Sequence, residues 1–379
     1  MGCSYQQKCG GCIYRDMEEK AYQDFKAGKI KKLLAQELNL TEKQWAEPIF
    51  IKDGYRRRAS FTFLFKKGQL LLGFNENKSD NIVNCTYCPM LTEKINKNIN
   101  GLHNFLENFC KIKTIKKLKG KKFCESSIIS GDILILEALN GLDCVLEIKE
   151  DIELSHRMEI FDYVNNNNDI IRFSYRKNSF SEAETIIEKI KPIIKIGGID
   201  VYVAAGTFLQ ASMPGEQALV NLVLKYLEGT NGKIADLFCG IGTFSYPLAK
   251  IKENKIVAAD VNESLLLGFK TSVNKQMLHN IEIVERNLFK YPFEAEDLKT
   301  FDAIVFDPPR AGAKAIVNEI AKIDDKSNLK KIVAVSCNPH SFINDAKVLI
   351  ESGYKLKSVT MVDQFVYSNH SELVALFTN

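Results

Sequence analysis

The second half of the chain, from about residue 206, alternates short apolar runs with longer amphipathic segments. Unbroken apolar runs are typical of buried parallel strands, and the segments between them have the spacing of helices. This alternation predicts an α/β domain built on a doubly wound, Rossmann-like parallel sheet. The expected strands include residues 233–238, 255–259, 301–306 and 331–335, with a helix at 216–227.

The first half has a different pattern. From about residue 49 the apolar positions favour short strands, and Lys67-Gly68 predicts a hairpin turn between residues 55–65 and 69–74. More short strands are expected across residues 123–203, so this part predicts a β-rich domain. Before it, residues 17–38 predict one long charged helix with apolar positions at Tyr22, Phe25, Ile30, Leu33 and Leu34.

Charge is distributed unevenly between these parts. Residues 1–122 hold 24 Lys and Arg against 12 Asp and Glu, a net charge of +12 (24 − 12). The net charge is −7 (8 − 15) over residues 123–200 and −1 (19 − 20) over residues 201–379. A local positive field of this kind indicates a polyanion partner, and we expect a nucleic acid. The alternative is a solvated, lysine-rich surface.

The ten cysteines of the chain are not expected to form disulfides, because no secretory signal precedes them. Cys3, Cys9 and Cys12 lie within ten residues, a density that packing explains poorly. Thiolates so spaced indicate a metal centre, either an Fe–S cluster or zinc, and both need a fourth ligand. Cys85 or Cys88 can supply it.

Polar or reactive side chains follow several of the predicted strands. In an open α/β sheet, ligands bind outside the carboxyl ends of the strands, so these side chains are expected at one edge. A cysteine in this position is either a packed core residue or a nucleophile. The residues concerned are Gln210, the turn 238–243, Asp260, Asn287, Asp307 and Cys337.

The glycine-rich turn after the first of these strands indicates the kind of ligand. It reads Gly240-Ile241-Gly242, without the third glycine of a dinucleotide fingerprint and without the Gly-Lys-Ser/Thr of a phosphate loop. Asp260 ends the next strand, where a carboxylate can hold two ribose hydroxyls. S-adenosylmethionine fits this combination, because it has a ribose and no phosphate.

These motifs together resemble the RNA uracil-5-methyltransferases, and the Fe–S-containing branch that acts on 23S rRNA is the most similar. The resemblance extends over essentially the whole chain, and we expect the branch without an N-terminal TRAM domain. The segments that carry it are Cys3-x5-Cys9-Gly-Gly-Cys12, Phe208-Leu-Gln210, Asp236-Leu-Phe-Cys-Gly-Ile-Gly242, Asp307-Pro-Pro-Arg310, Ser336-Cys337-Asn338-Pro339 and His370-Ser-Glu372.

The resemblance implies a division into domains and a cluster. Residues 1–14 and 48–205 would form the Fe–S and RNA-binding domain, and residues 15–47 and 206–379 the S-adenosylmethionine-dependent catalytic domain. It also implies a [4Fe-4S] cluster on Cys3, Cys9, Cys12 and Cys88, with Cys85 as the competing fourth ligand.

The same resemblance implies the residues that carry the chemistry. Cys337 would be the nucleophile that adds to C6 of uracil, and Glu372 the base that removes the C5 proton. Asp260 stands where the family usually has glutamate. The implied methyl-donor contacts are Gln210, Phe238, Thr243, Asp260, Asn287 and Asp307.

Other functions remain possible at this stage. The RNA is expected to be 23S rRNA, with tRNA as the alternative. Asp307-Pro308-Pro309 also resembles the motif of purine amino-group methyltransferases, although Arg310 replaces their aromatic residue. A non-catalytic Fe–S RNA-binding protein is the alternative from another class. No apolar run reaches the length of a membrane span, so we expect a cytoplasmic, monomeric protein without a membrane partner.

Overall fold

The computed structural model describes residues 2–117 and 123–379 of the chain. The chain forms two compact units. The first comprises Met1–Asp16, Lys52–Ile194 and Val203–Ser212, and the second Met17–Ile51, Lys195–Tyr202 and Met213–Asn379. Relative to the division expected from the sequence, residues 48–51 and 195–202 belong to the second unit, and residues 15–16 and 206–212 to the first.

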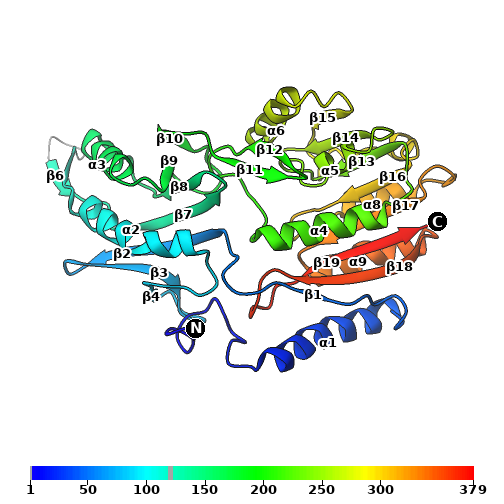
Figure 1. Cartoon of the computed structure of the whole chain (residues 1–379), viewed down its shortest axis with the longest axis horizontal. Helices are drawn as coiled ribbons and strands as arrows, with labels where there is room; N and C mark the ends of the chain where they lie inside the picture. Colours follow the sequence, from blue (N-terminus) through cyan, green and yellow to red (C-terminus); the bar gives the residue numbers. More distant parts are fainter. Residues whose placement is uncertain (1, 118–122) are drawn as a thin grey trace. The chain divides into compact units, whose positions relative to one another are not determined.

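An eight-stranded sheet forms the centre of the second unit (Figure 1). Strands β13 to β17 run parallel to one another, whereas β19 is antiparallel to both β17 and β18. This arrangement confirms the predicted α/β class. The strands, in spatial order, are β1 (Ile49–Phe50), β18 (Lys355–Asp363), β19 (Glu372–Thr378), β17 (Lys331–Ser336), β16 (Ala303–Phe306), β13 (Lys233–Leu237), β14 (Lys255–Asp260) and β15 (Ile281–Glu285).

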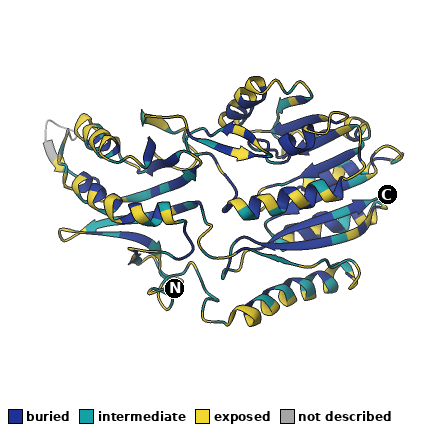
Figure 2. Ribbon diagram, viewed as in Figure 1, coloured by how far each residue is buried: buried dark blue, intermediate teal, exposed yellow. Residues whose placement is uncertain are grey.

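Strands β13, β14, β16 and β17 are mostly apolar and buried, as expected where both faces of a sheet are covered. Ala235 and Leu237 of β13 pack in the same core as apolar residues of α1, α8 and α9, while Ile234 is fully buried outside that cluster. In Figure 2 these strands are almost entirely dark blue. The helices of this unit are α1 (Glu19–Leu38), α4 (Met213–Tyr226), α5 (Ser245–Ala249), α6 (Glu263–Lys275), α7 (Ala295–Leu298), α8 (Lys314–Ala321) and α9 (Pro339–Glu351).

Helix α1 confirms the helix predicted over residues 17–38. The Glu18 side chain accepts a hydrogen bond from the Ala21 amide at its start, and Asn39 ends it with a left-handed backbone (φ 53°). Two positions differ from the predicted apolar face. Phe25 is 42% exposed, whereas Lys26 is only 3% exposed.

A buried ion pair explains the position of Lys26. Its Nζ donates to Asp363 Oδ1 at 2.6 Å and to the Phe365 carbonyl oxygen at 3.2 Å. The Tyr22 hydroxyl donates to Asp363 Oδ2 at 2.6 Å and accepts from the Tyr367 amide at 2.7 Å. Burial lowers the pKa of Lys26, and the Asp363 carboxylate opposes that shift. The network fixes α1 to the end of β18.

The first unit contains a mostly antiparallel seven-stranded sheet with two helices. Lys67 and Gly68 both have positive φ (52° and 77°), which confirms the predicted hairpin turn. Helix α3 was not predicted, since its residues were assigned to a region of short strands. The elements are β10 (Glu184–Glu188), β9 (Ile170–Arg176), β8 (Gly141–Glu147), β7 (Ser130–Ala138), β2 (Arg58–Lys66), β3 (Gln69–Asn75) and β4 (Ile82–Asn84), with α2 (Glu93–Lys111) and α3 (Leu154–Asn165).

Two small two-stranded sheets complete the described secondary structure. They are β5 (Thr114–Lys117) with β6 (Phe123–Ser126), and β11 (Ile193–Ile196) with β12 (Ile199–Tyr202). Among the described residues, no helix is both long and apolar enough to cross a membrane.

The network around Asp363 generates a stability prediction. Asp363→Ala leaves the Lys26 ammonium buried without its counter-ion, so the free energy of unfolding should fall by about 3–5 kcal/mol. Trp45 is the only tryptophan of the chain and lies in the second unit, so its fluorescence during urea unfolding reports on that unit. Adding Lys26→Met to Asp363→Ala should recover part of the lost free energy of unfolding, because the buried ammonium is then removed.

The matched control is Lys20→Met on the same helix. Lys20 forms a solvent-exposed ion pair with Asp24, so its loss should change the free energy of unfolding by no more than about 0.5 kcal/mol. An unfolding midpoint unchanged by Asp363→Ala would contradict the role given to the network.

Candidate active site

The carboxyl ends of the parallel strands in the second unit define the candidate site. Strand order runs from β15 through β14 to β13 in one direction, and from β16 to β17 in the other. The order therefore reverses between β13 and β16, and ligands of open α/β sheets bind at such switch points.

The turn after β13 has the backbone that a closely bound ligand requires. Phe238, Gly240 and Gly242 all have positive φ (61°, 55° and 89°). A Cβ on Gly242 would lie 2.6 Å from the Phe269 ring, so only glycine fits there. The Gly240 amide donates to Asp260 Oδ2 at 3.0 Å. The structure thus joins the glycine turn to the carboxylate at the end of β14, as the sequence predicted.

Two more predicted ligand residues lie near this turn. Thr243 is half-buried within it, and the Phe238 ring is 5.3 Å from the Phe289 ring. Asn287 Oδ1 accepts hydrogen bonds at 3.1 Å from the amides of Phe289 and Lys290. Asn287 therefore shapes the loop that carries Phe289.

Gln210 belongs to the first unit, unlike the other predicted ligand residues. It is buried, and its main-chain oxygen accepts from Arg57 Nε at 3.1 Å. In the same segment Phe208 is 59% exposed, with the Arg58 guanidinium 4.1 Å from its ring centre. The segment from Phe208 to Gln210 therefore combines a buried amide side chain with an exposed aromatic ring that lies against the Arg58 guanidinium.

Cys337, Asp307, Arg310 and Glu372 form a charged cluster. Cys337 follows β17 directly and is half-buried. Burial raises the pKa of its thiol to about 11, the Glu372 and Asp307 carboxylates add to that rise, and Arg310 opposes it. The predicted nucleophile and the predicted base thus interact electrostatically.

Glu372 is the first residue of β19 and is 3% exposed. Burial raises the pKa of its carboxyl to about 8, and Asp307 contributes to the rise. Gln364 Nε2 donates to Glu372 Oε1 at 3.2 Å, which stabilises the charged form, as Arg310 also does. A buried carboxyl that titrates near neutral pH is suited to proton transfer.

Asn338 links the cysteine turn to the turn after β16. Its Nδ2 donates to the Arg310 carbonyl oxygen at 3.0 Å, and its Oδ1 accepts from the His340 amide at 3.1 Å, which caps α9. The Arg310 Nη2 atom lies 3.2 Å from His370 Nε2. These contacts join the Ser-Cys-Asn-Pro, Asp-Pro-Pro-Arg and His-x-Glu motifs at one place.

Two residues of this edge were not among the predicted site residues. One is Gln364, the partner of Glu372. The other is Asp236, which is fully buried and accepts from Ser245 Oγ at 2.5 Å. Burial raises the pKa of Asp236 to about 7, and Asp307 and Asp260 add to the rise. A carboxyl group inside the apolar run of β13 was the available signal.

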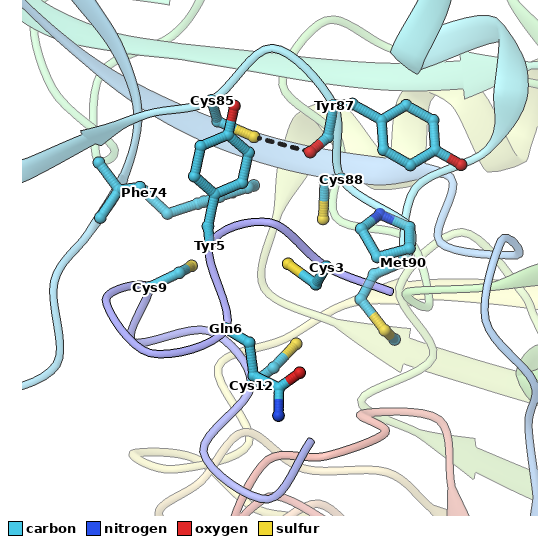
Figure 3. Close-up of a pocket in the computed structure, with 12 residues that line it drawn as sticks. Cys3, Tyr5, Gln6, Cys9, Cys12, Phe74, Cys85, Tyr87, Cys88 and Met90 are labelled. Carbon is cyan, nitrogen blue, oxygen red and sulfur yellow. Dashed lines mark hydrogen bonds between the residues drawn. The ribbon is translucent and has the colours of Figure 1, made fainter. Parts of the chain in front are cut away.

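The N-terminal cysteines line a separate pocket within the first unit. In Figure 3, Cys3, Cys9, Cys12 and Cys88 surround one space, to which Cys85 also contributes. The Cys85 thiol donates to the Tyr87 carbonyl oxygen at 3.4 Å. Five thiols line this pocket, and thiolate is the ligand type that soft metals and Fe–S clusters prefer.

The thiols of this pocket also affect one another electrostatically. Burial raises the pKa of Cys12 to about 12, with Cys88 as the largest neighbouring contribution. Burial raises the pKa of Cys9 and of Cys88 as well. In the described part of the chain, no group of three or more His, Cys, Asp or Glu side chains is arranged closely enough to hold a metal ion.

Fold and site together define an α/β methyltransferase. A family model described as tRNA (Uracil-5-)-methyltransferase matches residues 18–379. An uncharacterised RNA methyltransferase of Rhizobium meliloti is 35% identical over 97% of this chain and 81% of its own. A protein of Aliivibrio fischeri named 23S rRNA (uracil(1939)-C(5))-methyltransferase is 28% identical over 99% of this chain and 81% of its own.

Among solved structures, the Pyrococcus abyssi tRNA (uracil-54, C5)-methyltransferase in complex with S-adenosyl-L-homocysteine has the same fold. Its TM-score is 0.71 at 22% identity, over 97% of this chain and 86% of that one. The chain belongs to the tRNA (uracil-5-)-methyltransferase family. The predicted enzyme class, an RNA (uracil-5-)-methyltransferase, is confirmed, and the family supports S-adenosylmethionine as methyl donor.

The raised pKa of Glu372 generates a pH prediction. The folded state holds this proton more tightly than the unfolded state, whose carboxyl has the ordinary pKa of about 4.5. The stability that this group contributes is therefore fully present below about pH 4.5 and is lost as pH rises through about 8. Glu372→Gln removes this loss, so the variant should gain stability over the wild type as pH rises.

Urea unfolding at about pH 5 and about pH 9, followed by Trp45 fluorescence, measures the gain, which should reach a few kcal/mol at the higher pH. Glu351→Gln, at an exposed position, is the control and should unfold like the wild type at both pH values. Parallel pH dependence of wild type and Glu372→Gln would contradict the burial of an ionisable Glu372.

Proposed function

We propose that the protein methylates C5 of a uridine in 23S rRNA, with Cys337 as nucleophile and Glu372 as general base. The observation that carries this proposal is the cluster of Cys337, Asp307, Arg310 and Glu372 at the edge of a methyltransferase sheet. A purine amino-group methyltransferase needs no thiol in this place. We further propose a cytoplasmic, monomeric enzyme.

The thiol makes an unreactive carbon nucleophilic. Uracil C5 attacks electrophiles poorly until a nucleophile adds to C6. The Cys337 thiol loses its proton to solvent and adds as the thiolate, which forms an S–C6 bond and moves the C5–C6 π electrons into an enolate across C5, C4 and O4. Arg310, which opposes the rise in the thiol pKa, stabilises both the thiolate and negative charge on a uracil oxygen. Asp307 is placed to orient the base.

Glu372 completes the cycle. Bound S-adenosylmethionine would supply the methyl group: C5 would bond to the methyl carbon as the bond from that carbon to sulfur breaks, and S-adenosylhomocysteine would be left. The Glu372 carboxylate then takes the C5 proton, the electron pair restores the C5–C6 double bond, and the Cys337 thiolate leaves. With a pKa of about 8, Glu372 can accept this proton and release it near neutral pH.

The methyl donor is assigned to the glycine turn and its neighbours. Asp260, held by the Gly240 amide, is placed to accept hydrogen bonds from ribose hydroxyls. Phe238 and Asn287 would contact the adenine, and Thr243, Asp307 and Gln210 the remainder of the donor. The turn fits an adenosine ligand, because it combines the fixed Asp260 carboxylate with the Phe238 and Phe289 rings.

The RNA is proposed from the relatives and the cysteines. The Aliivibrio fischeri relative, named as acting on 23S rRNA, covers nearly the whole chain. The Pyrococcus abyssi neighbour is named as acting on tRNA, which makes tRNA the second candidate. The cysteine motif resembles the ribosomal branch, so we favour 23S rRNA. A uridine within folded RNA must be flipped out to enter the site.

For the cysteine pocket we propose a [4Fe-4S] cluster held by Cys3, Cys9, Cys12 and Cys88. Cys85 is the less suitable fourth ligand, because it is 4% exposed and its thiol already donates to the Tyr87 carbonyl oxygen. The cluster would supply cross-links among segments that are far apart in sequence. We assign it a structural role, since the proposed methylation cycle moves no electrons.

The proposed reaction is tested by mapping 5-methyluridine in 23S rRNA and tRNA from a strain that lacks the gene. One 23S rRNA position should lose the modification. Wild-type protein should restore it, Cys337→Ser should not, and Cys110→Ala, at a buried thiol of α2 in the first unit, should restore it.

Purified Glu372→Gln separates the two catalytic roles. It should accumulate a covalent protein–RNA adduct in the presence of S-adenosylmethionine, because the C5 proton is not removed, and Cys337→Ser should form none. Methylation by Cys337→Ser would refute the uracil-C5 mechanism. Loss of the modification in tRNA alone would replace 23S rRNA by tRNA.

The cluster assignment predicts a metal content. Protein purified without oxygen should be brown and contain about four iron and four sulfide per chain. Cys88→Ser should lower the iron content to less than about half, because a three-thiolate cluster is labile, whereas Cys85→Ser should retain most of it. Colourless protein loaded with zinc would overturn the cluster, and equal iron loss in both variants would overturn the choice of Cys88.

A further inference from the structure

We infer that the face of α1 beside Cys337 binds the sugar–phosphate backbone of the RNA strand that carries the target uridine, through Lys29 and Lys32. The inference rests on the proposed function, since it assigns part of the substrate to that same site. It concerns only residues of the second unit.

A cleft of about 580 Å³ connects the thiol to α1. Lys29 and Lys32 line it from the helix, and His340 and His370 line it near Cys337. Lys29 and Lys32 are three residues apart, so they lie on the same face of α1. A volume of this size exceeds a water site and suits a nucleotide with part of its backbone.

The charged side chains that line the cleft favour an anionic ligand. Arg310 joins the two lysines in its lining, and none of the described residues that line it is Asp or Glu. Three fixed positive charges in one concave surface raise the local concentration of a polyanion.

The pairing of lysines along α1 singles out the same face. Three lysines of this helix form ion pairs: Lys20 with Asp24, Lys26 with Asp363, and Lys31 with Glu42. Lys29 and Lys32 are exposed and form no ion pair with any described residue. The two lysines left for an outside anion are the two that face the cleft.

Charge also divides the site into two parts. Asp307 lies near the thiol, where its charge repels phosphate but not a neutral uracil. The cations of α1 attract phosphate at the other side of the cleft. A uridine bound with its base at Cys337 and its backbone along α1 places the neutral base beside the carboxylate and the phosphates beside the lysines. Contacts between lysine and phosphate do not distinguish one base from another. The two lysines therefore hold the strand in place, and the pocket at Cys337 recognises the uracil.

The experiment compares Lys29→Gln/Lys32→Gln with Lys20→Gln/Lys31→Gln. Both variants lose two positive charges from one helix, but only the first loses them from the cleft. The probe is a fluorescent oligouridylate of roughly twelve nucleotides, long enough to track a charged groove. Anisotropy gives Kd between roughly 0.05 and 0.2 M salt.

The cleft variant should bind about tenfold more weakly at physiological salt, and its slope of log Kd against log salt should be lower by about 1.4, the value for two lost contacts to single-stranded phosphates. The control should bind within about twofold of the wild type. An oligouridylate with uncharged methylphosphonate linkages should bind wild type and cleft variant equally, because it offers no phosphate charge.

Equal Kd and equal salt slope in the two lysine variants would overturn the inference, as would a difference that persists on the methylphosphonate probe. The proposed function fails separately. Methylation by Cys337→Ser refutes the chemistry and leaves the phosphate contact measurable, whereas an inactive Cys337→Ser with unaffected lysine variants refutes only the phosphate contact.

Discussion

The buried ion pair between Lys26 and Asp363 is the interaction on which the catalytic edge depends. Asp363 ends β18, and the loop that follows carries Gln364, whose amide holds Glu372, and His370, which contacts Arg310. A charged pair without solvent is stable only in a fixed geometry. The pair therefore determines both the position of α1 and the path of the loop that leads to Glu372.

A second constraint is the concentration of carboxyl groups at one end of the sheet. Asp307 lies within electrostatic reach of both Asp236 and Glu372. The pKa of Asp236 is raised to about 7 and that of Glu372 to about 8. Burying like charges costs stability, and here Arg310 offsets part of that cost. The raised pKa values follow from burial first and from the neighbouring carboxylates second.

The fold was predictable wherever a single pattern dominated. Unbroken apolar runs identified the strands around Asp260, Asp307 and Cys337, because both sheet faces are covered. Lys26 was not predictable, since an isolated lysine on a helix is normally solvated and its partner Asp363 lies 337 residues further along the chain. Helix α3 was missed because its apolar residues do not form a clean stripe: Leu154, Met158 and Phe161 are more than half exposed.

For the candidate site, the sequence predicted which side chains lie at one edge of the sheet, but few of the contacts between them. The ends of parallel strands bring Asp260, Asp307 and Cys337 to one edge by topology alone. The partners that tune them, such as Gln364 beside Glu372 and Asn338 between two turns, depend on loop conformations that no periodicity reveals. The assignment of Gln210 to the other unit also has no signature in local sequence.

The antiparallel direction of β19 has a consequence for how the enzyme can vary. Ser336, just before Cys337, pairs with Leu373, just after Glu372. The separation of Cys337 and Glu372 is thus set by the register of two neighbouring strands and not by the 35 residues (372 − 337) of chain between them. Helix α9 and its connection to β18 can lengthen or shorten without moving the two groups apart, so that stretch is free to diversify while the chemistry stays constant.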